Sequence, residues 1–152
     1  MTVTSDKGET KAMTALSRFI DDLQDLLQVP AELGDEAVGV AAIIQQRLAM
    51  PVNHIDSVGR SVAIPCPIPN TLDWFADAIP NLPKDLQSIS DNLVNLADSL
   101  PWYRRPEPAY AEFMQAHANA QVIGPQGLLV RHDIMVGVSL INSHITYPDH
   151  WL

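Results

Sequence analysis

The stretch that decides the fold is Gln121–Val130, which reads QVIGPQGLLV. It places short apolar runs on either side of the turn residues Gly124–Gly127. Downstream, Ile134–Ile141 (IMVGVSLI) is rich in β-branched residues, which favour strands. Short apolar runs separated by turn residues are typical of β-strands joined by tight connections. We therefore expect the last part of the chain to form a small sheet.

The chain upstream of this stretch has a helical pattern instead. Apolar residues recur at three- and four-residue steps over residues 11–28, 35–50 and 83–99, which predicts three helices. Asp35 is a good N-cap for the second helix. The third carries an apolar stripe from Leu82 to Leu100 that has too few heptads for a coiled coil, so we expect it to pack within the domain.

Two further segments complete the predicted organisation. Residues 51–69 hold four prolines without a helical period, which indicates an extended connector. Residues 102–120 predict one more helix, with His117 as a packing residue on its apolar face. We therefore predict an α+β chain with a helical region over residues 1–118 and a β-region over residues 119–152.

Composition restricts the classes of function. The chain has 152 residues and a formal net charge of -9, so binding to a phosphate backbone would begin from electrostatic repulsion. No apolar run reaches the roughly 20 residues that a membrane span needs, and the polar N-terminal residues do not resemble a secretory signal. We expect a cytoplasmic protein that binds neither nucleic acid nor membrane. The acidic excess favours a solvated or acid-paired role for Arg104 and Arg105 over carboxylate binding.

Four sequence features then occur in a diagnostic order. They are Pro-x-Tyr-x-x-Phe at 108–113, Ala-x-x-Ile-Gly-Pro-x-Gly-Leu at 120–128, the predicted strand at 134–141 and Tyr-Pro-x-His at 147–150. In this order they resemble the cupin-type dimethylsulfoniopropionate (DMSP) lyases. The resemblance implies that residues 119–152 are the first strands of an incomplete cupin-like β-barrel that follows N-terminal helices. It also implies a carbon–sulfur lyase that cleaves DMSP to dimethyl sulfide and acrylate by metal-assisted β-elimination.

The chain departs from the family pattern after His150. The family continues into a second histidine, a glutamate, a tyrosine and a later histidine that bind Zn, Mn or Fe, whereas this chain has Leu152 where the first metal-binding histidine stands. We therefore expect a truncated gene product or an excised part of a longer enzyme, and favour truncation. Such a chain is expected not to hold the divalent metal tightly and to have little or no activity alone.

The resemblance also names candidate site residues. Tyr147 matches the family tyrosine that acts as base or orients the substrate, and His150 matches a pocket residue beside the metal. A tyrosine acts as a base only as phenolate, a form that a metal or cation favours. Trp102 and Tyr103 are candidates for the substrate pocket because aromatic faces attract cations such as a sulfonium. Without the resemblance, Tyr147 would be an amphipathic tyrosine at a strand end, and packing would be the preferred role for Trp102 and Tyr103.

The expected partner is therefore a small molecule, DMSP. A homodimer formed through the helices is a further expectation. The alternative from another class is a non-catalytic helical protein, which would bind a partner through the Leu82–Leu100 stripe or through the unpaired strands.

Overall fold

The computed structural model describes residues 5–50, 64–65, 78–106 and 109–148. The chain divides into two compact units. The helical unit is formed by Met1–His54 with Ile79–Ser99, and the sheet unit by Ile55–Ala78 with Leu100–Leu152. Most of the predicted proline-rich connector lies outside the described residues. The predicted boundary after residue 118 stays a prediction.

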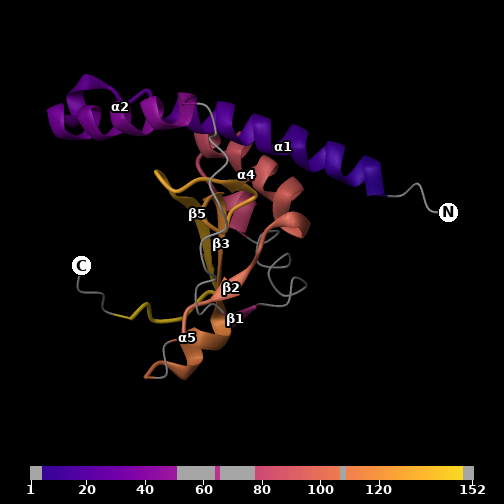
Figure 1. Cartoon of the computed structure of the whole chain (residues 1–152). Coiled ribbons are helices and arrows are strands. Elements are labelled where there is room, and N and C mark those ends of the chain that lie inside the picture. Colours follow the sequence, from indigo (N-terminus) through magenta and orange to yellow (C-terminus); the bar gives the residue numbers. More distant parts are fainter. Residues whose placement is uncertain (1–4, 51–63, 66–77, 107–108, 149–152) are drawn as a thin grey trace. The chain divides into compact units, whose positions relative to one another are not determined.

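The helical unit contains the three helices that the apolar spacing predicts (Figure 1). They are α1 (Ser5–Leu26), α2 (Asp35–Ala49) and α4 (Lys84–Leu96), accompanied by the short 3-10 helices η1 (Ala31–Leu33), η2 (Ile79–Asn81) and η3 (Ala97–Ser99). The acidic residues Asp35 and Glu36 lie in the first turn of α2, where they complement the helix dipole. Asp35 is not the N-cap, because Gly34 occupies that position with a φ of 92° that glycine adopts easily.

The core of the helical unit lies between α1 and α4, which contact each other extensively. Leu16 and Phe19 are buried on α1, and Leu96 is fully buried on α4. Burial of such side chains stabilises each by roughly 1.5–3 kcal/mol. The apolar face of α4 therefore packs within its own unit, as the absence of sustained heptads predicted.

A polar cluster joins the same two helices. The Asp22 carboxylate of α1 accepts hydrogen bonds from Asn92 Nδ2 (2.7 Å) and Ser88 Oγ (3.0 Å) of α4. Asn92 is 8% exposed, so its amide depends on this partner for a hydrogen bond. The cluster fixes the register of α1 against α4, because the carboxylate can accept both donors in one arrangement only.

The substitution Asp22→Ala should lower the free energy of unfolding by about 1–2 kcal/mol, because it leaves the buried Asn92 amide without its acceptor. Urea unfolding followed by circular dichroism measures this loss. Asp21→Ala is the matched control, since Asp21 carries the same charge one position earlier and is exposed. Equal stabilities of the two variants would contradict the role given to the cluster.

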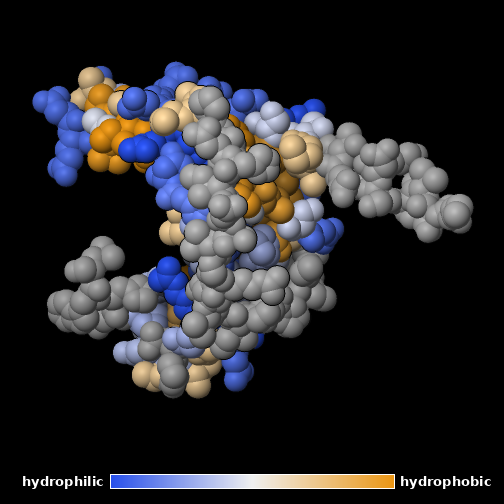
Figure 2. All heavy atoms as spheres, in the orientation of Figure 1, coloured by the Kyte–Doolittle hydropathy of each residue, from blue (hydrophilic) through white to orange (hydrophobic). Residues whose placement is uncertain are grey.

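The α2 helix is much less buried than its neighbours. Ala41 is its one buried residue, whereas Val38, Val40 and Ile43 are exposed. Apolar side chains accordingly gather on the surface over α2 (Figure 2). The helical period of this segment thus predicts its secondary structure correctly but does not predict how much of its apolar face is buried.

The sheet unit is built around one long strand, β3 (His117–Gly124). The other strands are β1 (Ile64–Pro65), β2 (Tyr103–Arg104), β4 (Leu129–Val130) and β5 (Val136–Ile141), and one short helix, α5 (Ala111–Ala116), precedes β3. The strands pair in the order β1-β2-β3-β4, and β5 pairs with β3 in antiparallel orientation. Within the described residues the sheet does not close, which confirms the predicted α+β class with helices followed by a partial sheet.

The two faces of β3 differ in character. Ala118, Ala120 and Val122 are almost completely buried and form the apolar face. Because successive strand residues point to opposite faces, His117, Asn119 and Gln121 share the other, polar face. The sheet therefore separates an apolar core from a polar surface that can build a site.

A bulge between Gln121 and Ile123 interrupts the pairing of β3 with β5. Gly137 lies opposite the bulge, where a Cβ atom would stand 2.6 Å from Ala120 O. Only glycine permits this close approach of the two backbones. The glycine that interrupts the β-branched run of β5 is thus required by the strand pairing.

The predicted helix over residues 102–120 is wrong in its extent. The helix covers only α5, and His117 begins β3 instead of continuing the helix. The antiparallel pairing of His117 with Ile141 and of Ala118 with Leu140 provides hydrogen bonds that the helical pattern did not anticipate. Tertiary strand pairing therefore overrides the local helix preference of this segment.

An ion pair between the buried Arg131 and the exposed Asp133 lies in the connection between β4 and β5. Arg131 is 6% exposed and donates through Nε and Nη2 to the two carboxylate oxygens of Asp133, at 2.9 and 2.7 Å. These hydrogen bonds raise the pKa of Arg131, with burial acting in the opposite direction.

Among the described helices, none is long and apolar enough to cross a membrane.

Candidate functional site

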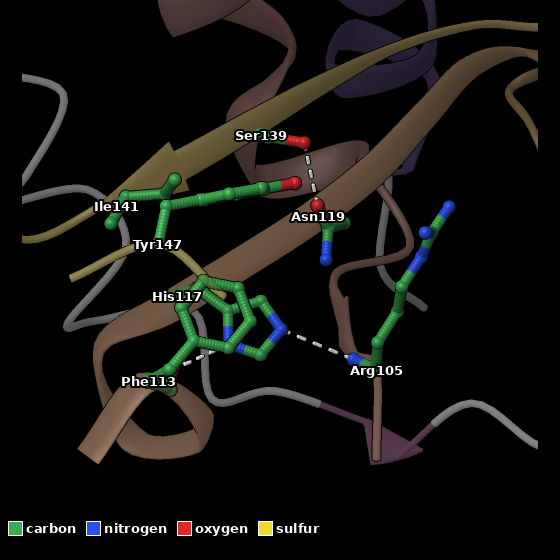
Figure 3. A pocket seen from close by; sticks show the side chains of 7 residues that line it. All are labelled: Arg105, Phe113, His117, Asn119, Ser139, Ile141 and Tyr147. Carbon is green, nitrogen blue, oxygen red and sulfur yellow. Dashed lines mark hydrogen bonds between the residues drawn. The ribbon is translucent and has the colours of Figure 1, made fainter. Parts of the chain in front are cut away.

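The polar face of β3 forms one wall of a cavity of about 100 Å³ within the sheet unit. This volume holds several water molecules or one small organic molecule, since one water needs roughly 10–15 Å³. The lining residues come from the segment after β2, from α5, β3 and β5, and from the turn after β5 (Figure 3), and they are Arg105, Phe113, His117, Asn119, Ser139, Ile141 and Tyr147.

Strand register brings four of these residues together. His117 pairs with Ile141 and Asn119 pairs with Ser139 across the β3–β5 ladder. Directly opposed residues on one face have Cβ atoms about 4.5–5.5 Å apart, so the two pairs form one continuous patch. The Ser139 hydroxyl donates to Asn119 Oδ1 at 2.6 Å and orients the amide.

His117 is the structural centre of the site. It is 2% exposed, and its ring stacks on Phe113 with a centroid distance of 4.1 Å. Nδ1 donates to Phe113 O (2.6 Å), and Nε2 accepts the Arg105 N–H (3.2 Å). The first bond satisfies a carbonyl at the end of α5, a common role for histidine at a helix C-terminus. The neutral imidazole thus connects α5, β3 and the segment after β2 (Figure 3).

Tyr147 reaches the cavity from the turn that follows β5. Asn142 N–H donates to Ala116 O (2.8 Å), and His144 has a left-handed φ of 64°, a conformation that histidine accepts more often than most residues. Beyond this turn, the Tyr147 ring meets Phe113 edge-on with centroids 5.4 Å apart. Tyr147 is 53% exposed, and its hydroxyl points toward the side where Ser139 and Asn119 lie (Figure 3).

The other predicted site residues lie elsewhere or outside the described residues. Trp102 is 4% exposed and packs in the core, and Tyr103 is half-buried on β2, paired with Asn119. Neither is among the residues that line this cavity. His150 lies outside the described residues. Of the four predicted residues, the structure places only Tyr147 at the cavity, and the roles of the others stay predictions.

Asn119 and Ser139 are site residues that the sequence motifs do not predict. Their signal is the alternation of polar side chains along two strands, His117-x-Asn119-x-Gln121 in β3 and Ser139 in β5. Alternation of this kind shows which face of a strand is polar. The pairing of Asn119 with Ser139 follows only from the register of β3 against β5. The charge of Arg105 made it a candidate for carboxylate binding in the sequence. The hydrogen bond between its backbone N–H and His117 is a feature of the tertiary structure.

The described residues do not offer a ligand set for a divalent metal. Nowhere in the described part of the chain do three or more His, Cys, Asp or Glu side chains gather as they would around an ion. His117, the imidazole in the cavity, uses both ring nitrogens in hydrogen bonds. The cavity is lined by polar and aromatic side chains, which suit a small organic molecule.

Comparison with protein families identifies the chain. A family model described as dimethylsulfoniopropionate lyase matches residues 37–151. The chain belongs to the DMSP lyase family. The match covers about three quarters of the sequence and includes every residue that lines the cavity.

The cavity lies within the part of the chain that matches the DMSP lyase family. No curated protein and no solved structure matches the chain. The cupin-like form of the barrel stays a prediction. The family relationship and the position of Tyr147 in the cavity are the two findings on which a functional proposal can be built.

Proposed function

We propose that this DMSP lyase family member is a carbon–sulfur lyase that cleaves DMSP to dimethyl sulfide and acrylate. The observation that carries the proposal is the family match over residues 37–151, which includes the cavity and Tyr147. The polar and aromatic lining supports a small substrate with a carboxylate at one end and a cationic sulfonium at the other, because aromatic faces attract cations. A cytoplasmic location and a homodimer formed through the helices belong to the same proposal.

The reaction is a β-elimination. A base removes a proton from the carbon next to the carboxylate, the electron pair of that C–H bond forms the C=C bond, and the C–S bond breaks. Its electrons leave with sulfur, so the sulfonium becomes neutral dimethyl sulfide and the remaining fragment is acrylate. The base therefore has to reach the carbon beside the carboxylate, while the sulfonium lies farther along the molecule.

Tyr147 is the proposed base. It lines the cavity, it belongs to the family motif Tyr-Pro-x-His, and its hydroxyl points toward the polar wall (Figure 3). Its aromatic face is also available for the sulfonium, because cations bind favourably to such faces. We further propose His150, Trp102 and Tyr103 as substrate-pocket residues. The divalent metal of the family would act as a Lewis acid on the carboxylate when bound.

Headspace gas chromatography tests the proposal. The purified chain is incubated with DMSP in the presence of EDTA or of added Mn²⁺, Zn²⁺ or Fe²⁺, and dimethyl sulfide is quantified against a protein-free blank with the same ions. We expect slow release above the blank, strengthened by at least one of the metals. The absence of dimethyl sulfide above the blank under all four conditions would reject the lyase proposal.

A further inference from the structure

The geometry points to Arg105 and Asn119 as a carboxylate-binding pair that holds a small organic acid without a metal. The identity of the acid as DMSP or its product acrylate rests on the proposed function. Recognition of a carboxylate rests on the cavity alone. The inference assigns a substrate-binding role to Arg105, for which the acidic composition had favoured a solvated or acid-paired role.

Arg105 provides the positive charge of the cavity. Its side chain is exposed, and within the described residues no carboxylate forms an ion pair with its guanidinium. The formal net charge of -9 repels anions from the protein as a whole, so an acid can be held only where a local cation reverses the potential. Among the described residues, Arg105 is the only lysine or arginine that lines the cavity.

The backbone of Arg105 is held in place. Its N–H donates to the buried His117 Nε2 (3.2 Å), and the neighbouring Arg104 Nε donates to His117 O (3.2 Å). Both contacts fix the end of β2 against the first residue of β3. The root of the Arg105 side chain is thus preorganised, which lowers the entropy lost when the guanidinium binds a ligand.

Asn119 adds neutral donors beside this charge. Its Oδ1 accepts the Ser139 hydroxyl (2.6 Å), so the Nδ2 group is directed into the cavity with its two N–H donors. A carboxylate has two oxygens that accept several hydrogen bonds, and a guanidinium can bind both at once. The pair therefore matches a carboxylate in charge and in donor number.

The opposite wall defines the rest of the ligand. Phe113 and Tyr147 place two aromatic rings across from the polar groups (Figure 3). The volume of about 100 Å³ admits only a short chain behind the carboxylate. The predicted ligand class is a short-chain carboxylic acid, either neutral or cationic at its far end.

A titration of the protein with acrylate in the presence of EDTA tests this inference. Ligand-observed NMR monitors the titration and gives Kd. Propionate is the saturated comparison, and propionamide has nearly the same shape without the charge. We expect both acids to bind and propionamide not to bind. Arg105→Gln should weaken acrylate binding by roughly 10-fold or more, because a hydrogen-bonded ion pair is lost. Arg105→Lys should weaken acrylate binding less than Arg105→Gln, since lysine keeps the positive charge but cannot bind the carboxylate in a bidentate way.

Two controls make the result specific. Arg18→Gln removes one positive charge from the exposed surface of α1 and should leave Kd unchanged. Asn119→Ala should weaken binding less than Arg105→Gln, because it removes uncharged donors. Unchanged acrylate binding in Arg105→Gln would overturn the inference, as would equal binding of propionamide or no binding of either acid by the unmodified chain.

The outcome is separable from that of the proposed function. Arginine-dependent acrylate binding without any dimethyl sulfide release would support the carboxylate site and reject the lyase proposal. Dimethyl sulfide release together with acrylate binding that does not depend on Arg105 would support the lyase proposal and reject the carboxylate site.

Discussion

Replacement of Tyr147 by Phe should reduce the rate of dimethyl sulfide release by roughly 100-fold or more, the usual contribution of a positioned general base. The substitution removes only the hydroxyl and keeps the ring that contacts Phe113 edge-on. The reduction should therefore appear mainly in kcat, with KM little changed, because the aromatic face that contacts the substrate remains. Headspace measurement over a range of DMSP concentrations separates kcat from KM.

Tyr110→Phe is the matched control for this experiment. Tyr110 is also a partly exposed tyrosine of the sheet unit, but it does not line the cavity. Its variant should keep the full rate. If Tyr147→Phe retained more than half of the activity of the unmodified chain, the hydroxyl could not be the base, and the catalytic role assigned to Tyr147 would be rejected.

Replacement of His117 by Leu should lower the free energy of unfolding by roughly 2–5 kcal/mol, because one buried and one part-buried polar group lose their partners. Leucine fills a similar volume, so the loss reports on hydrogen bonding more than on packing. The Phe113 carbonyl and the Arg105 N–H both depend on the imidazole. Urea unfolding measures the change, and acrylate affinity should fall as well because Arg105 loses its anchor.

His144→Asn serves as the control for His117→Leu. His144 is exposed in the turn after β5, and asparagine also tolerates its left-handed φ of 64°. This variant should stay within about 0.5 kcal/mol of the unmodified chain. A loss below 1 kcal/mol in His117→Leu would contradict the central role assigned to the imidazole.

The helices show how far local patterns reach. The three-and-four spacing predicted α1, α2 and α4 because each helix depends mainly on contacts within its own segment. The same spacing failed at residues 117–120, where the pairing of Ala118 with Leu140 determines the structure. The periodicity of α2 likewise could not show that Val40 and Ile43 stay exposed, because burial depends on which surfaces meet.

The candidate site divides in the same way. Tyr147 could be identified from its sequence motif, which is a local property of residues 147–150. Asn119 and Ser139 are separated by 20 residues, and only the register of β3 with β5 makes them a pair. Arg105 could be recognised as a charge from the sequence, but its attachment to His117 depends on the meeting of β2 and β3.

Local patterns were enough to predict α1, α2 and α4, the strands of the C-terminal segment, the acidic charge and the family motif that contains Tyr147, since each is encoded in neighbouring residues. The end of α5, the strand residues that face the cavity and the cation beside them depend on the tertiary structure. Those features arise from hydrogen bonds and packing between distant segments, and a one-residue shift in strand register would place Asn119 and Ser139 on different partners.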